Sequence, residues 1–121
     1  MGLDMYACKT LEEVTHPVDF SIENAEVIQS WRKHPNLHGW MEMLYREKGG
    51  TGPDFNCDTL LLTLDDLVRL ETDVKNDALP CTDGFFFGIS DGTEKEDDIM
   101  FIENARQAIW QGYRVFYDSW W

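Results

Sequence analysis

Apolar and polar residues alternate near both ends of the chain and follow a helical period between them. Near the start, Leu3, Met5 and Ala7 stand at every second position, which predicts a strand with one face turned inward. Residues 9–24 are polar and contain a His-Pro step, so we expect a loop or a sheet edge there. The segment 25–31, AEVIQSW, predicts a second short strand.

The clearest helix follows Pro35. Apolar residues then recur at intervals of three and four positions: Leu37, Trp40, Met41, Leu44 and Tyr45. This spacing places them on one continuous face and predicts an amphipathic helix. Pro35 fits the first turn of that helix, where a backbone N–H has no helical partner. The Gly-Gly pair at 49–50 predicts its end.

A short apolar run at 59–62 predicts a third strand, and a second helix follows it. Thr63 and Asp66 have the spacing of a capping box, in which each side chain bonds to the other residue's backbone N–H. The segment FFFGIS, 85–90, predicts another strand, which begins after Gly84.

A charged turn then leads into a third helix that ends at Gly112, and the alternating segment 113–121 predicts a final strand. The inner stripe of this third helix is expected to consist of Ile99, Ile102, Ala105 and Ile109. Strands and helices in this mixed order lack regular βαβ repeats. They predict a single α+β domain over residues 1–121, with about three helices packed on a small, mainly antiparallel sheet.

The amino-acid composition and net charge make some classes of function less favourable than others. The chain has 121 residues, enough for one core, and 43% of them are hydrophobic, as in a globular protein. With 10 basic and 23 acidic residues the net charge is −13, which disfavours direct contact with nucleic acid or anionic lipid. That charge suits a solvated acidic surface, a basic protein partner, or imitation of the charge of a nucleic acid.

The chain carries no sign of a membrane or a secreted context. No apolar run approaches the roughly 20 residues that span a bilayer, and the N-terminal segment lacks the pattern of a secretion signal. Cys8, Cys57 and Cys81 are odd in number and widely spaced, which favours reduced thiols in a cytoplasm.

Candidate catalytic and metal-binding residues are few. His34 and His38 are four residues apart, but Pro35 disfavours helical geometry at His34 and stands where a zinc protease needs glutamate. We expect neither a metal site nor a cofactor. Cys57 or Cys81 with His38 is the pair considered for nucleophilic catalysis, although no local motif marks either cysteine as activated.

Three consecutive phenylalanines stand between two glycines in LPCTDGFFFGIS. In an amphipathic strand Phe86 faces away from its two neighbours. The strand is therefore either buried on both faces, or one ring lines a pocket. Gly84 and Gly88 permit a close approach to the backbone at each end.

Taken together and in this order, the segments MGLDMY, WRKHPNLHGW, FNC, LPCTDGFFFG and YDSW resemble a family of small proteins common in bacteriophage and prophage genomes. The resemblance spans nearly the whole chain. Its residues are Trp31, Arg32, Lys33, His38, Cys57, Gly84, Phe85, Phe86, Phe87, Gly88, Ser119 and Trp120. The chain departs from that pattern in Trp121 and in its acidity. The resemblance implies a phage-encoded accessory protein in the cytoplasm of a bacterial host.

The segment 31–40 is locally basic and aromatic in an otherwise acidic chain. It suits a planar anion such as a nucleotide, through stacking and charge-assisted hydrogen bonds, and equally suits salt bridges that tether acidic loops. We expect its side chains to converge on one concave site with residues 84–88 and the C-terminal end. The residues expected to bind a ligand or partner are Trp31, Arg32, Lys33, His38, Gly84, Phe86, Gly88, Ser119 and Trp120.

Two functional hypotheses follow. The first is a non-enzymatic binding protein that interferes with host physiology or defence, either by inhibiting a host protein or by sequestering a nucleotide. The second is a small hydrolase or transferase for a nucleotide or related metabolite, with His38 as acid and base and with Arg32 and Lys33 holding phosphate. Besides a host protein or nucleotide, a second copy of the chain is a further partner to consider.

Overall fold

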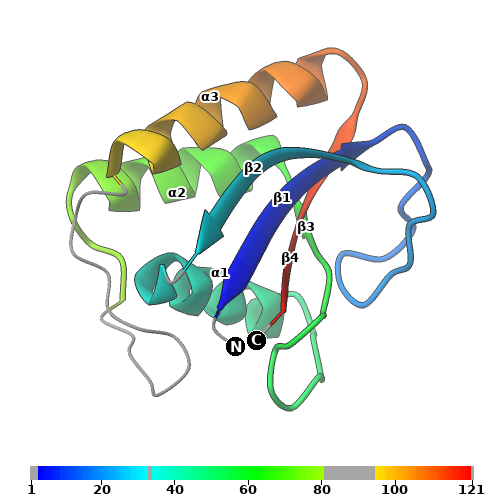
Figure 1. Ribbon diagram of the computed structural model, residues 1–121, viewed down its shortest axis with the longest axis horizontal. Coiled ribbons are helices and arrows are strands. Elements are labelled where there is room, and N and C mark those ends of the chain that lie inside the picture. The colour runs from blue at the N-terminus through cyan, green and yellow to red at the C-terminus, as the bar shows by residue number, and fades with distance from the viewer. Residues whose placement is uncertain (1–2, 33, 81–94, 121) are drawn as a thin grey trace.

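The computed structural model describes residues 3–32, 34–80 and 95–120 and shows a four-stranded antiparallel sheet with helices on one face (Figure 1). The strands are β1 Asp4–Thr10, β2 Glu26–Arg32, β3 Leu60–Leu62 and β4 Arg114–Trp120, and the helices are α1 Pro35–Glu47, α2 Leu64–Lys75 and α3 Lys95–Trp110. The sheet order is β2-β1-β4-β3. The predicted α+β class is confirmed, and the strand predicted at 85–90 lies outside the described residues.

The inner face of the sheet carries the apolar side chains that meet the helices. On β1, Met5 and Ala7 are fully buried, and Leu3 just before the strand is buried with them, as the alternation predicted. The register places Ser119 opposite Met5 and Tyr117 opposite Ala7, so these residues share the same face. Full burial of each large apolar side chain stabilises the fold by about 1.5–3 kcal/mol.

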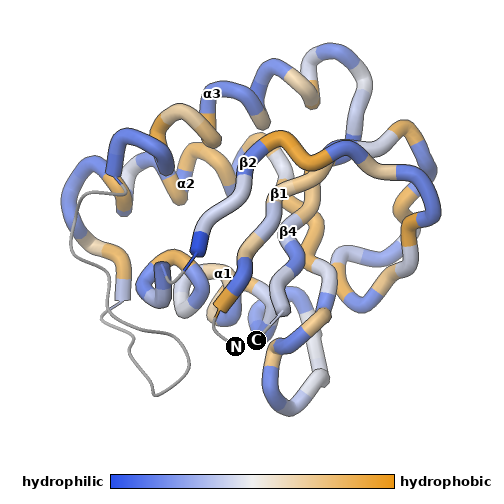
Figure 2. Tube along the Cα trace, in the orientation of Figure 1, coloured by the Kyte–Doolittle hydropathy of each residue, from blue (hydrophilic) through white to orange (hydrophobic). Residues whose placement is uncertain are grey.

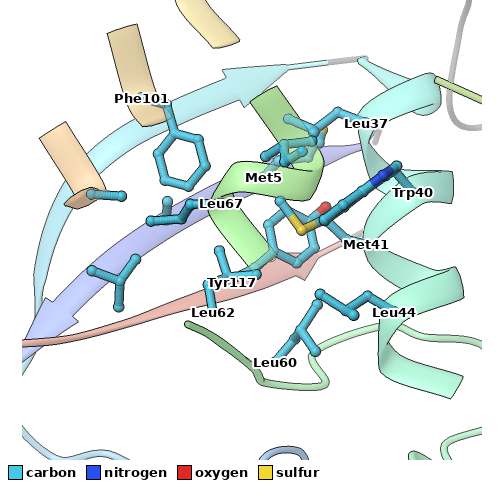
Figure 3. Packing of buried hydrophobic residues seen from close by; sticks show 14 of the residues in the cluster. Met5, Leu37, Trp40, Met41, Leu44, Leu60, Leu62, Leu67, Phe101 and Tyr117 are labelled. Atoms are coloured by element: carbon cyan, nitrogen blue, oxygen red, sulfur yellow. The ribbon is translucent and has the colours of Figure 1, made fainter. Parts of the chain in front are cut away.

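The core fills the space between this face and the three helices. Figure 3 shows Trp40 and Met41 extending from α1 on one side of the core, with Leu67 of α2 and Phe101 of α3 on the other side. Apolar and hydrophilic residues alternate along each helix (Figure 2), as expected for helices that bury only one side.

The predicted helix ends of α1 and α2 are confirmed in detail. Pro35 occupies the first turn of α1, and Gly49 follows the helix at φ 96°. In α2, the Thr63 side chain accepts from the Asp66 N–H while the Asp66 carboxylate accepts from the Thr63 N–H. These contacts satisfy backbone groups that have no partner inside the helix.

The predicted inner stripe of α3 packs on the core, but the prediction omitted Phe101. Ile102 and Ala105 are buried as expected, but Ile99 and Ile109 are only partly buried. Phe101 also faces the core, where its ring packs edge-on against Trp31 with the ring centroids 5.1 Å apart. The apolar pattern of the helix alone did not reveal this aromatic contact.

Residues 11–25 cross the outer face of the sheet at one end, in agreement with the loop or edge expected there. Phe20 packs edge-on against Phe116 of β4, with ring centroids 5.5 Å apart. Val18 forms an isolated antiparallel bridge with Leu60, so the segment also covers the outer edge of β3. Residues 11–25 do not cover the other end of the outer face.

Candidate functional site

Trp31 and His34 belong to a buried polar network rather than to an accessible site. The Trp31 indole N–H donates to Asp98 Oδ1 at 3.0 Å, and His34 Nε2 lies 2.9 Å from Asp98 Oδ2. All three residues are buried. Since Asp98 lies in the first turns of α3, this carboxylate ties α3 to the end of β2 and to the start of α1. The network accounts for part of the polar character of residues 31–40.

His38 points into the core from α1. Its Nδ1 lies 2.7 Å from the Tyr117 hydroxyl, and its ring stacks on Phe55 with centroids 5.0 Å apart. Burial lowers the pKa of His38 to about 4, and burial raises the pKa of Tyr117 well above its usual value. Both groups are therefore neutral at pH 7. A histidine that is 1% exposed does not reach a substrate in solution.

Cys57, the alternative nucleophile, lies in the exposed loop before β3. Burial raises the pKa of its thiol, and the carboxylates of Asp118 and Asp58 raise that pKa further. Its Sγ lies 3.6 Å from Asn56 Oδ1. A thiol held in its protonated form beside carboxylates is a poor nucleophile. The local chemistry therefore gives no support to a Cys57–His38 catalytic pair.

The accessible end of the sheet's outer face carries a regular set of polar and aromatic side chains. Asp4 of β1 stands between Arg32 of β2 and Trp120 of β4, and Tyr6 stands between Ser30 and Asp118 on the same three strands. Residues at alternate positions of a strand share a face. We call this set the open-face patch; its members are Asp4, Tyr6, Ser30, Arg32, Asp118 and Trp120.

The open-face patch presents its largest side chain to solvent. Trp120 is 67% exposed, although it lies at the end of a central strand. Beside it, Arg32 Nε lies 3.7 Å from Asp4 Oδ1, and both side chains remain accessible. Tryptophan, tyrosine and arginine are the side chains that contribute most often to binding energy at protein interfaces. The patch therefore has the composition of a recognition surface.

Carboxylates make one side of the open-face patch strongly acidic. Burial raises the pKa of Asp118, and the neighbouring Asp58 raises it further. Burial also raises the pKa of Asp58, with Asp19 and Asp54 adding to the effect. The mutual repulsion of these groups is relieved when a cation approaches. This side of the patch is therefore a site of concentrated negative charge.

The expected site residues separate between two faces of the sheet. Trp31, His38 and Ser119 are buried on the inner side, whereas Arg32 and Trp120 project from the outer face. Trp31, Arg32, Ser119 and Trp120 lie at one end of the sheet, but their side chains do not face one hollow. Successive side chains of a strand point to opposite faces of the sheet. Trp31 and Arg32 therefore lie on different faces, and so do Ser119 and Trp120.

Four of the expected residues fall in parts of the chain that are not described. Lys33, Gly84, Phe86 and Gly88 lie outside the residues that the structure describes. Four other members of the patch were not expected from the sequence: Asp4, Tyr6, Ser30 and Asp118. Each stands at an outward position of a strand, and the alternation of inward and outward positions along the strand could have indicated this. The pairing that gathers them depends on strand order, which the alternation does not specify.

Among residues 3–32, 34–80 and 95–120, no group of three or more His, Cys, Asp or Glu side chains is arranged to hold a metal ion. Within the same ranges no helix is both long and apolar enough to cross a membrane. Comparison with protein-family models, with curated proteins and with solved structures finds no match to this chain.

Proposed function

We propose that this chain is a small acidic binding protein that inhibits a host protein, and that the open-face patch is its contact surface. The observation that carries the proposal is the exposure of Trp120 in the patch, between an ion pair and a group of carboxylates. An aromatic anchor with charged neighbours is the usual composition of a protein-binding hot spot. The net charge of −13 favours a basic target, including one that normally binds nucleic acid.

The biological setting of the proposal rests on the sequence resemblance. A likeness to small bacteriophage and prophage proteins favours a phage-encoded inhibitor that acts in the cytoplasm of a bacterial host. A basic host protein would meet the acidic side of the open-face patch, and Trp120 would enter a pocket of that protein.

The enzymatic alternative has less support. His38 lies inside the core with a lowered pKa, while Arg32 projects from the outer face of the sheet. An acid–base group and a phosphate-holding group must face the same substrate. Turnover of a nucleotide panel by the wild type, lost in His38→Ala, would restore this alternative.

A photo-crosslinking experiment tests the proposal. A benzophenone amino acid is placed at position 120, with position 11 as the control because Leu11 is equally exposed, at 68%, and lies outside the patch. The tagged proteins are irradiated in bacterial lysate, and the adducts are identified by mass spectrometry. We expect a defined host protein at position 120 and not at position 11.

Affinity for the identified protein then decides the role of the indole. Trp120→Ala is expected to weaken binding about thirtyfold, the effect of losing a hot-spot residue worth about 2 kcal/mol. Leu11→Ala is expected to leave it unchanged. Equal adducts at both positions, or a nucleotide released from the purified protein with no host protein bound, would contradict the proposal.

A further inference from the structure

A groove lies at the opposite end of β4 from Trp120. It has a volume of about 560 Å³ and runs between the end of β3, the first turn of α2 and the turn that joins α3 to β4. Its floor and walls are mainly apolar and include Leu61, Leu62, Leu64, Ile109 and Tyr113. A hollow of this size is within the range of ligand-binding sites.

The apolar surface continues beyond the groove on α2. Leu64 is 37% exposed, and Val68, one turn later on the same side of α2, is 55% exposed. Large apolar side chains gathered around a hollow are characteristic of surfaces that bind a partner.

Arg114 lines the same groove and differs from the other basic residues of the chain. Every other lysine and arginine in the described ranges pairs with a carboxylate, whereas Arg114 has no ion pair there. This is unexpected in a chain with 23 acidic residues. An arginine guanidinium binds a carboxylate through two parallel hydrogen bonds. The groove thus offers an apolar floor with an available cation at its edge.

We propose that this groove binds the C-terminal end of a partner protein, with apolar side chains on its floor and the terminal carboxylate on Arg114. The groove is open to solvent, which suits a peptide because one side of its backbone can keep its hydrogen bonds to water. An alkyl chain would instead leave apolar surface exposed. Asp65 also lines the groove and disfavours a second anion, so the occupant carries a single carboxylate there.

A pair of peptides tests the assignment. The probe is an N-acetylated tetrapeptide of leucine and phenylalanine with a free C-terminal carboxylate, and its C-terminal amide is the matched control. Binding to the whole chain is followed by the amide NMR signals of Leu64 and Gly112. We expect the acid to bind and to shift both signals, and the amide to bind at least about tenfold more weakly.

Variants connect that difference to Arg114. Arg114→Gln is expected to reduce affinity for the acid to the level of the amide. Arg69→Gln, which removes an arginine paired with Glu47 on the surface, is expected to leave it unchanged. An unchanged melting temperature in Arg114→Gln confirms that the variant is folded. If Arg114→Gln does unfold, equal affinity of the wild type for acid and amide still decides against the proposal.

Three further results would overturn the assignment. They are failure of the acid to bind at millimolar concentration, unchanged affinity in Arg114→Gln, and tighter binding of decanoate than of the peptide. The inference is independent of the proposed function, because Trp120→Ala removes a member of the open-face patch and leaves the groove intact. A groove that binds peptide while Trp120→Ala has no effect on the host partner would refute the proposed function alone.

Discussion

Asp98 shows how much of this structure depends on single buried groups. Its carboxylate accepts from Trp31 and pairs with His34, and it is 1% exposed. Each of these partners comes from another part of the chain. A buried polar group that loses its hydrogen-bond partner keeps the full cost of its desolvation. Residues of the segment 31–40 that looked available for a ligand are therefore used in holding α3.

Asp98→Ala is expected to lower the free energy of unfolding by about 3 kcal/mol, because it leaves the Trp31 and His34 side chains buried without this acceptor. Chemical denaturation measures the loss. Asp97→Ala is the control, since it removes a charge from the same turn of α3 at an exposed position. Its expected cost is below about 1 kcal/mol. Similar losses in the two variants would contradict the structural role of Asp98.

All three helices end with the same hydrogen-bond pattern, a Schellman motif. After α1, Gly49 N–H donates to Arg46 O and Gly50 N–H donates to Tyr45 O. The equivalent position after α2 is Asp77, which adopts φ 53° without being glycine. A side chain in this left-handed region costs roughly 1 kcal/mol, and glycine avoids most of that cost. The end of α2 is thus less favourable than the end of α1.

Asp77→Gly is accordingly expected to raise the free energy of unfolding by about 0.5–1 kcal/mol, even though it removes the exposed ion pair with Lys95. Thermal or urea denaturation detects a change of this size. Asp77→Ala removes the same ion pair but keeps a side chain in the left-handed region, so it should bring no gain. Equal stability of the glycine and alanine variants would show that the backbone strain at position 77 is negligible.

The elements that sequence predicts well here are those with local causes. The Thr63–Asp66 capping box and the Gly-Gly stop after α1 act within a few residues, and both were predicted. The Trp31–Asp98 bond joins residues 67 positions apart, and nothing near either residue indicates it. The open-face patch has the same origin, because strand order and not strand pattern brings Ser30 beside Tyr6.

At the scale of the whole molecule, the buried histidine and the carboxylates with raised pKa values change the stability in opposite directions as the pH falls. His38 has a native pKa of about 4 against an ordinary value of 6.5. The unfolded chain therefore takes up a proton that the folded chain does not, and stability decreases as the pH falls from 6.5 to 4. Asp58 and Asp118 have raised pKa values, so their protonation favours the folded chain at lower pH.

The contribution of His38 to this pH dependence can be isolated with His38→Gln, because the glutamine side chain is uncharged at any pH. We expect the wild type to lose about 3 kcal/mol more than the variant between pH 7 and pH 4, whatever the absolute stability of each. Urea denaturation at a series of pH values gives the difference. Parallel curves for the two proteins would mean that His38 titrates normally in the folded state.

The pairing of β1 with β4 at the centre of the sheet has a consequence for how this protein is made. From Asp4 opposite Trp120 to Thr10 opposite Arg114, the central ladder joins the first strand to the last. A ribosome releases β1 long before β4 exists, so β1 lacks its central neighbour during most of translation. Contacts so distant in the chain also slow folding, because loop-closure entropy is lost before they form. During synthesis the apolar face of β1 thus remains available to chaperones, and a product truncated before β4 would be a substrate for proteolysis.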